Sequence, residues 1–363
     1  MYSTNRYDVC GKSKFCKQIK EELKENAIPF YKDYIFDTYS MSLKMKDIEK
    51  GKRIPLTFGL LRAIHKIKPD ILITEGYFQW TPLVLLYSLI FKIPVYMGYE
   101  RTLHTERYTG KFKTWQRKLF NKYFTGFLVN GQETKKYLES LGVNSTKIHI
   151  GGMNADAKWL KFKVKETSPT DKEKWKKNYI KDKDGLLYLF SGRISEPKGV
   201  HFLLHAWEKH IKQYPKDVLL LIGYGNKYDE FKKIYSNEKS IHLLGYVDYS
   251  EIYKFYAISD VFILPTLQDN WSLVVPEAMA CGLPIATSIY NGCYPELVHK
   301  DENGITFDPY KEETLINALD YFHHQNLKAM GQKSTELEKN FNTENCARRV
   351  YEALNKSLSK QKI

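Results

Sequence analysis

Cysteine is scarce in this 363-residue chain, and the cysteines present form no metal or disulfide pattern. The chain has five, an odd number, scattered without a CxxC pair or histidine-rich metal spacing. We therefore expect them to be reduced and mainly structural, as is usual in the cytoplasm. They are Cys10, Cys16, Cys281, Cys293 and Cys346.

Long apolar runs are absent as well. The most apolar window, residues 83–91 (LVLLYSLIF), has about half the length that a membrane-spanning helix needs, and Lys92 and Pro94 close it. We predict a buried helix there. The opening residues, MYSTNRYDVCGKSKF, contain no apolar stretch of signal-peptide length. The sequence therefore predicts a cytoplasmic protein.

Glycine-rich phosphate-binding loops of the familiar patterns are also missing. No G-x-G-x-x-G follows the first strand, which gives a dinucleotide-dependent oxidoreductase little support. Gly11-Lys12-Ser13 looks like the end of a triphosphate-binding loop but lacks the upstream glycine and a preceding apolar strand. Residues 1–9, which precede it, are polar.

Positive charge, in contrast, is in excess. Lys and Arg number 56 against 42 Asp and Glu, for a net charge of +14. This balance favours phosphates, nucleic acid or anionic lipid as partners. The cations are dispersed and no nucleic-acid-binding module appears, so we expect no nucleic-acid partner. With 43% hydrophobic residues, the chain is long enough for two globular lobes of about 100–200 residues each.

Helical and strand-like segments alternate along both halves, which is typical of βαβ units on parallel sheets. The pattern predicts an α/β fold with two doubly wound, Rossmann-like domains. A lysine-rich stretch, residues 158–184, is the predicted linker. The expected helices are 13–25, 54–67, 81–91, 200–210, 228–235, 250–257, 275–281 and 344–359, and the expected strands are 70–74, 93–98, 185–191, 218–223, 241–244, 260–265 and 284–288.

One polar pattern lies in residues 191–199 (SGRISEPKG), where a strand end leads into a helix. Free N–H groups at a helix start attract phosphate oxygens. Arg193 and Lys198, five residues apart, are therefore candidates for a diphosphate clamp. The alternative is a surface arginine and lysine that flank a turn, and spacing alone does not decide between the two.

A second pattern, residues 269–284 (DNWSLVVPEAMACGLP), has the same order of strand end, polar loop and helix. Glu277 lies about two helical turns beyond Asp269. A carboxylate on such a helix can accept hydrogen bonds from ribose hydroxyls, while the N–H groups of Ser272 and Leu273 can meet phosphate. Taken alone, the pattern is an ordinary helix with Asp269 as its cap and Glu277 in solvent.

The two patterns together, with Gly223-Tyr224-Gly225 between them, resemble glycosyltransferase family four. The second lobe of that family carries an Arg-x(4)-Lys clamp and a Glu-x(7)-Glu motif followed by Ala-x-Ala-x-Gly-x-Pro. The resemblance is close over residues 185–310 and looser before them. The family normally begins with a clear strand, so the polar residues 1–9 are either an atypical strand or a sign that the true start lies upstream. It implies a GT-B fold whose two domains face each other across a cleft: an acceptor-side domain at 1–160, a donor-binding domain at 161–343, and a helix at 344–363 that crosses back to the first domain.

The resemblance also implies individual roles. Arg193 and Lys198 would hold the donor diphosphate and act in catalysis, and Glu277 would hold the ribose. Asp269, a further candidate catalytic residue, stands where the family usually has its first glutamate, beside the donor sugar, and reaches one methylene less far. The other donor-binding residues implied are Asn270, Ser272, Leu273, Val247 and Gly225.

In the first lobe, residues 99–107 (YERTLHTER) place five ionisable side chains within eight positions after a strand. The resemblance implies that a histidine here faces the donor sugar, which makes His104 a candidate catalytic residue. The alternative is a salt-bridged start of a surface helix. The candidates on the acceptor side are Gly11, Glu100, Arg101 and Glu106.

Asp182-Lys183-Asp184 has the spelling of the metal-binding Asp-x-Asp of single-lobed glycosyltransferases, but its charged surroundings favour a turn. We predict no metal and no cofactor beyond the nucleoside diphosphate sugar, which is a co-substrate. Residues 111–124 (KFKTWQRKLFNKYF) allow two interpretations. They form a helix on an anionic membrane surface or, as we expect, a helix whose aromatic rings lie in the core.

The resemblance thus implies a retaining, metal-independent glycosyltransferase that moves a hexose from a nucleoside diphosphate sugar to a glycan or glycolipid acceptor. Polysaccharide assembly, of lipopolysaccharide or capsule type, is the expected setting, in the cytoplasm or at the inner face of the membrane. The alternative is a catalytically weak nucleotide-sugar-binding protein or scaffold of the same fold, for which Asp269 is the argument.

Overall fold

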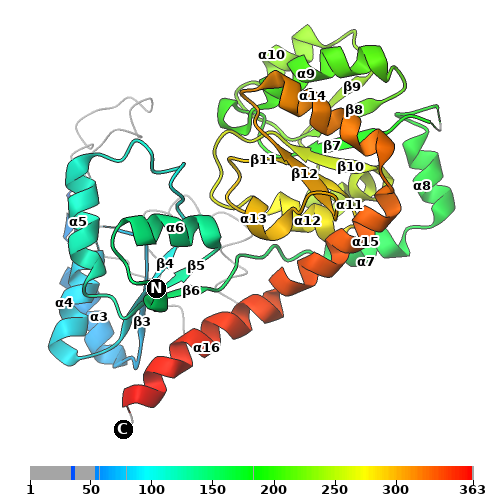
Figure 1. Ribbon diagram of the computed structural model, residues 1–363. Helices are drawn as coiled ribbons and strands as arrows, with labels where there is room; N and C mark the ends of the chain where they lie inside the picture. The colour runs from blue at the N-terminus through cyan, green and yellow to red at the C-terminus, as the bar shows by residue number, and fades with distance from the viewer. Residues whose placement is uncertain (1–33, 37–53, 57, 79, 183, 362–363) are drawn as a thin grey trace. The chain divides into compact units, whose positions relative to one another are not determined.

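The computed structural model describes residues 34–36, 54–56, 58–78, 80–182 and 184–361 (Figure 1). By their contacts they fall into two compact units. The first contains the described residues up to Gly98, residues 116–127 and the residues from Ser357 on, and the second contains residues 99–115 and 128–356. Gly11, the polar start at 1–9 and the predicted helix at 13–25 lie outside the described residues. The boundary after residue 160 stays a prediction.

A parallel sheet with the strand order β3-β4-β5-β6 begins in the first unit. Its strand β4 (Val95–Tyr99) is buried almost throughout, as expected of a parallel strand covered on both faces. The other elements of this part of the chain are β1 (Tyr34–Phe36), β2 (Ile54–Leu56), α3 (Phe58–Ile67), β3 (Leu72–Glu75), α4 (Thr81–Phe91), α5 (Lys111–Asn121), β5 (Gly126–Val129), α6 (Gln132–Ser140), η4 (Ser145–Lys147) and β6 (Ile148–Ile150).

Two sequence predictions for this part are wrong in detail. Residues 54–67 were expected to form one helix, but Ile54–Leu56 is strand β2, antiparallel to β1, and the helix begins at Phe58. Pro55 explains the difference, because proline lacks an N–H and disfavours helical geometry in the residue before it. Helix α4 is only half buried, since its apolar residues surround the whole helix and Leu89 and Ile90 are more than half exposed.

Helix α5 corrects another expectation. The aromatic residues of 111–124 were expected in the core, but Phe112 is 73% exposed and Trp115 is 60% exposed, whereas Phe124, just beyond the helix, is buried as expected. The two exposed rings are neighbours, with centroids 5.9 Å apart, because residues three apart lie on one face of a helix. In the described part of the chain, no helix has both the length and the apolar character needed to cross a membrane.

The second unit contains a six-stranded sheet in the order β9-β8-β7-β10-β11-β12, and its neighbouring strands are parallel. This is the doubly wound order: β8 and β9 follow on one side of β7, and β10, β11 and β12 follow on its other side, so the switch point lies between β7 and β10. The predicted α/β class is confirmed. The strands are β7 (Leu187–Ser191), β8 (Val218–Ile222), β9 (Ile241–Gly245), β10 (Val261–Leu264), β11 (Ile285–Ser288) and β12 (Gly304–Phe307).

Helices cover both faces of this sheet, as Figure 1 shows. Helices α9 and α14 pack together, and α12 packs on α7 and α15. The helices and short 3-10 turns of this part are α7 (Lys158–Glu166), α8 (Pro169–Lys176), η5 (Glu196–Lys198), α9 (Val200–Gln213), α10 (Tyr228–Ile234), α11 (Tyr249–Ile258), α12 (Val274–Ala280), α13 (Tyr294–Leu297), α14 (Glu312–Tyr321), η6 (Phe322–His324), α15 (Leu327–Glu338), η7 (Lys339–Phe341) and α16 (Thr343–Gln361).

The predicted linker at 158–184 is wrong for most of its length, because it forms α7 and α8. Leu160 and Val164, four residues apart, are buried on one face of α7, and both helices pack on α11. Lysine is a good helix former, so the many lysines do not prevent the helix. The predicted turn is present: the Asp184 N–H donates to Asp182 Oδ1 over 3.0 Å, and both carboxylates pair with Lys216.

Helix α16 confirms the helix predicted at 344–359. By contact its residues through Lys356 belong to the second unit and those from Ser357 to the first, where Ser357 Oγ lies 2.5 Å from Tyr96 Oη. The start of α16 is held within the second unit by an ion pair between Lys158 and Glu344 and by a 2.7 Å hydrogen bond from Asn154 to Thr343.

Candidate functional site

The topological switch point of the six-stranded sheet lies between β7 and β10, and the loops after their carboxyl ends carry the two predicted motifs. Ligands of doubly wound sheets bind in the crevice at this position. The structure brings the motifs together: Lys198 Nζ, beyond β7, forms an ion pair with Asp269 Oδ2, beyond β10. These residues are 71 positions apart in the sequence, so their contact depends on the sheet order and not on local structure.

Asp269 organises the second loop. Its Oδ2 also accepts a 2.6 Å hydrogen bond from Ser272 Oγ, and its Oδ1 accepts the Trp271 N–H at 3.2 Å. The Ser272 N–H is held by Asn291 Oδ1 at 3.3 Å. Asp269 therefore caps its loop, as the plain interpretation of the motif predicted, and also pairs with the lysine of the other motif.

Close backbone packing fixes the first loop. A Cβ on Gly223, after β8, would lie 1.9 Å from the Gly192 carbonyl oxygen, and one on Gly225 would lie 2.2 Å from that of Ile194. Only glycine permits such an approach, and Gly223 also has a φ of 130°. The predicted Gly225 thus shapes the loop that carries Arg193, whose side chain is exposed.

Glu277 lies on α12, half buried, and its Oε2 accepts a 3.1 Å hydrogen bond from the buried Tyr256 hydroxyl. Burial raises the pKa of this carboxyl, and the Tyr256 bond opposes the rise. The alternative that Glu277 is an ordinary solvated residue is therefore wrong. Leu273, at the start of α12, is 43% exposed, and Val247, after β9, packs partly against the core.

His104 is placed beside the same loops. Its Nε2 lies 2.9 Å from the Leu267 carbonyl oxygen, and its ring stacks on Tyr290 with centroids 4.4 Å apart. Burial lowers the pKa of His104, partly opposed by the Leu267 bond, so the neutral ring is favoured. Because a carbonyl only accepts, Nε2 carries the proton, and Nδ1 keeps its lone pair for another donor.

The remaining predicted acceptor-side residues divide into two groups. Glu100 is exposed, and its Oε1 lies 3.5 Å from Asn270 Nδ2, so the structure joins it to the second motif. Glu106 instead contacts Arg101 at 3.8 Å and accepts a hydrogen bond from Thr109. For that pair, the surface salt bridge that the sequence left open is the arrangement found.

Sequence reasoning missed Glu296. It lies on the four-residue helix α13, and its Oε1 accepts the Gln132 N–H. Its Oε2 is buried with no hydrogen-bond partner in the described part of the chain. Burial raises the pKa of Glu296 to about 7. Asn130 donates to the Glu100 and Asn270 carbonyls at 3.3 and 3.2 Å. Glu296 belongs to no motif, so only the three-dimensional contacts identify it.

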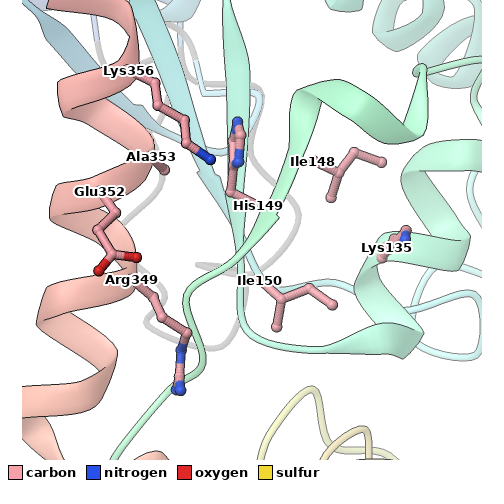
Figure 2. Close-up of a pocket in the computed structure, with 8 residues that line it drawn as sticks. All are labelled: Lys135, Ile148, His149, Ile150, Arg349, Glu352, Ala353 and Lys356. Carbon is pink, nitrogen blue, oxygen red and sulfur yellow. The ribbon is translucent and has the colours of Figure 1, made fainter.

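A separate hollow of about 330 Å³ lies between β6 and α16 (Figure 2). Lys135, Arg349 and Lys356 line it together with His149, whose pKa is lowered by burial and by Lys356. Arg349 donates to the Gly151 and Asn340 carbonyls, so its charge is already used to hold α16. Neither predicted motif reaches this hollow.

Comparison with known proteins identifies the second half of the chain. Residues 171–343 match the family described as "Glycosyl transferases group 1". An uncharacterised glycosyltransferase of Methanocaldococcus jannaschii is 28% identical over 253 residues, which are 65% of this chain and 60% of the relative. The alpha-monoglucosyldiacylglycerol synthase of Acholeplasma laidlawii is 29% identical over 180 residues, 47% of this chain and 44% of the synthase. The chain thus spans about half the length of these relatives.

The fold is found in solved structures as well. The crystal structure of Anabaena HepE in complex with UDP aligns with a TM-score of 0.68 at 18% identity, over 82% of this chain and 81% of that one. At such low identity the likeness shows the fold alone, and it confirms the predicted GT-B class.

Proposed function

Because residues 171–343 form a group 1 glycosyltransferase domain, we propose that this chain transfers a hexose from a nucleoside diphosphate sugar to a glycan or glycolipid acceptor, with retention of the anomeric configuration. The observation that carries the proposal is the ion pair between Lys198 and Asp269 at the switch point of the sheet. It places a cation beside the loop N–H groups, where a diphosphate would bind. The UDP held by the similar Anabaena structure supports a nucleotide donor.

The chemistry follows from the charges at this position. When the bond between the anomeric carbon and the diphosphate oxygen breaks, negative charge collects on the diphosphate, and Arg193 and Lys198 stabilise it. The acceptor oxygen bonds to the anomeric carbon on the same face, and its proton passes to the departing phosphate. No side-chain nucleophile and no metal is required. Glu277 holds the ribose, and the neutral His104 accepts a hydrogen bond from a sugar hydroxyl through Nδ1.

Donor hydrolysis tests the proposal. The purified chain is screened without metal against nucleoside diphosphate sugars, and release of nucleoside diphosphate is measured. Arg193→Ala is expected to lower kcat/KM about 100- to 1000-fold, the usual cost of one preorganised charge partner, and Glu277→Ala to raise KM. Arg348→Ala, an exposed arginine of α16, is the control and leaves the rate unchanged.

The outcomes of this assay distinguish a transferase from a nucleotide-sugar-binding scaffold. Turnover of one donor, lost in Arg193→Ala and kept in Arg348→Ala, supports the transferase. Binding of a donor with no turnover, even with lipid and glycan acceptors present, favours the scaffold. Turnover that survives Arg193→Ala contradicts the assigned clamp.

We further propose that the acceptor is linked to lipid and that the chain contacts the cytoplasmic face of an anionic membrane through α5. Phe112 and Trp115 are exposed on one face of this helix, and Lys111 and Lys113 beside them are exposed as well. Exposed rings flanked by lysines are typical of helices that lie in the headgroup region. The glycolipid in the name of the Acholeplasma relative supports this acceptor class.

Vesicle sedimentation tests the membrane contact. The chain is expected to sediment with vesicles that contain anionic lipid and not with purely zwitterionic ones. Phe112→Ser combined with Trp115→Ser abolishes sedimentation, whereas Tyr351→Ser, an exposed aromatic residue of α16, leaves it intact. If the double variant sediments as much as wild type, α5 is not the helix that binds the membrane.

A further inference from the structure

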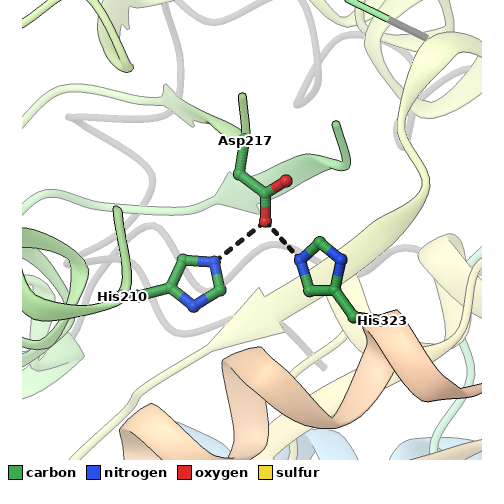
Figure 3. A group of neighbouring side chains, drawn as sticks. All are labelled: His210, Asp217 and His323. Carbon is green, nitrogen blue, oxygen red and sulfur yellow. Dashed lines mark hydrogen bonds and ion pairs between the residues drawn. The ribbon is translucent and has the colours of Figure 1, made fainter. Parts of the chain in front are cut away.

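A second cluster of chemically active side chains lies away from the switch point. His210 Nε2 is 2.9 Å from Asp217 Oδ2, and His323 Nε2 is 2.7 Å from the same oxygen. Figure 3 shows the two imidazole rings converging on the aspartate from opposite sides. The three atoms lie within 4.8 Å of one another, and within the described ranges this is the single group of three or more histidine, cysteine or acidic side chains so arranged.

Surrounding groups fix the orientation of all three side chains. His210 Nδ1 is 2.6 Å from Asp320 Oδ1, and the Leu186 N–H donates to Asp217 Oδ1 over 2.8 Å. The His323 ring stacks on Tyr214 with centroids 3.7 Å apart and planes within 7°. A carboxylate on the far nitrogen of a histidine is the usual partner of a metal-binding imidazole, because it fixes the tautomer and aims the other nitrogen at the ion.

Burial and charge also suit a cation. The side chains of His210 and Asp217 are 0% and 1% exposed, while His323 is 13% and Asp320 22% exposed, so solvent reaches one edge of the cluster. With neutral histidines the two aspartates carry a charge of −2, which one divalent ion neutralises. Without an ion, the same neutrality needs two imidazolium ions, one of them fully buried, and burying a charge is costly.

We propose that His210, Asp217 and His323 bind a zinc-type divalent cation, with water from the exposed edge as the fourth ligand. Two imidazole nitrogens and a carboxylate are donors that Zn²⁺ accepts in tetrahedral sites. Bonds of about 2.0–2.2 Å separate tetrahedral ligand atoms by about 3.3 Å. The nitrogen-to-oxygen distances of 2.9 and 2.7 Å therefore widen by about half an ångström, and the two nitrogens, which lie within 4.8 Å of each other, adjust to the same separation.

The position of the cluster indicates a structural ion and not a catalytic one. Asp217 directly precedes β8, whereas the donor loops follow the carboxyl ends of the strands. Five strand residues at about 3.3 Å each separate these two edges of the sheet. His210 lies in the last turn of α9, and His323 lies in η6 after α14. The ion would thus join α9, the start of β8 and η6, and it leaves the metal-free chemistry proposed at the switch point unchanged.

Metal binding to the full chain, purified without a histidine tag, tests the proposal. Chelator-treated protein is equilibrated with Zn²⁺, and the bound metal is measured by elemental analysis. One zinc per chain is expected, with Tm raised by about 5–10 °C at a free concentration 100 times Kd. Co²⁺ in place of Zn²⁺ is expected to give the visible absorption bands of a four-coordinate site.

Variants at and beside the site provide the controls. His323→Gln is expected to weaken Zn²⁺ binding at least 100-fold and to remove the cobalt bands, whereas His324→Gln, its exposed neighbour in η6, changes neither. Asp320→Asn, which leaves the three ligands in place, is expected to weaken binding about 10- to 100-fold.

Several results would overturn the site. Less than a tenth of an equivalent of zinc at micromolar concentration, or equal binding in the His323 and His324 variants, would mean that the cluster is a buried ion-pair network only. If His323→Gln fails to fold, the cobalt spectrum of the wild-type chain decides: bands of a six-coordinate, all-oxygen ion refute the proposal.

Discussion

Glu296 should make the chain less stable as the pH rises through neutrality. Its carboxyl has an ordinary pKa of 4.5 when exposed, and burial raises the pKa to about 7 in the folded chain. Between these two values the folded state binds more protons than the unfolded state, so the free energy of unfolding falls as pH rises. The stabilisation relative to high pH is complete below about pH 4.5 and is lost above about pH 7.

The magnitude follows from the same two pKa values. Their difference corresponds to at most about 3.4 kcal/mol. Glu296 is half buried, so solvent screens part of this energy, and about 1–2 kcal/mol is the expected effect. Two neighbouring charges shift the pKa of Glu296 in opposite directions: Glu133 raises it and Lys136 lowers it. The Gln132 N–H also lowers it, and a glutamine at 296 would keep that hydrogen bond.

The assay compares the unfolding of wild type and Glu296→Gln in urea at pH 5.5, 7 and 8.5. As the pH rises, the free energy of unfolding of the variant is expected to increase by about 1–2 kcal/mol relative to that of wild type, because the neutral amide carries no charge to bury. Glu166→Gln, at an exposed glutamate of α7, is the control, and its free energy of unfolding should change with pH in the same way as that of wild type. A stability difference between Glu296→Gln and wild type that stays constant across this pH range would refute the reasoning.

Two further predictions concern the loops at the switch point. Gly223→Ala is expected to cost at least about 2 kcal/mol of unfolding free energy, because its φ is 130° and its Cβ would meet the Gly192 carbonyl; urea unfolding measures the loss, and Gly110→Ala, with open space around it, should cost little. His104 is expected to titrate below 6.5 in an NMR pH series, since burial favours its neutral ring, with the proton on Nε2. A midpoint above 6.5 would contradict the burial argument.

The sequence predicted the second unit better than the first, for a physical reason. The core strands β7, β8 and β10 are continuous apolar runs because helices cover both faces of a parallel sheet, and such runs are visible in the sequence. Helix α7 was missed because only Leu160 and Val164 mark its buried face among many lysines. Composition suggested a linker, whereas two apolar residues four apart were enough for packing.

The sequence predicted only those residues of the candidate site that belong to a sequence motif. Lys198 and Asp269 belong to recognisable sequence motifs, and the order of strands in the sheet brings them into contact. Glu296 belongs to no motif. What distinguishes it is the hydrogen bond from the Gln132 N–H, 164 positions away, and the burial of its second carboxylate oxygen. Long-range burial of this kind has no periodicity, so a single sequence does not reveal it. The paired histidines His210 and His323 were missed for the same reason, since they are 113 positions apart and not in metal-motif spacing.

The pairing of Lys198 with Asp269 bears on whether the shorter acid at 269 weakens the site. An ammonium group has three N–H donors, and the carboxylate takes at least one, which leaves Lys198 able to reach a phosphate oxygen without losing its partner. Ser272 and the Trp271 N–H hold the carboxylate from the other side. A glutamate, one methylene longer, would have to fold back to keep these short contacts. Under the proposed function, these contacts fit an anchor that aims Lys198 better than a truncated sugar-binding residue, and such an anchor is compatible with turnover.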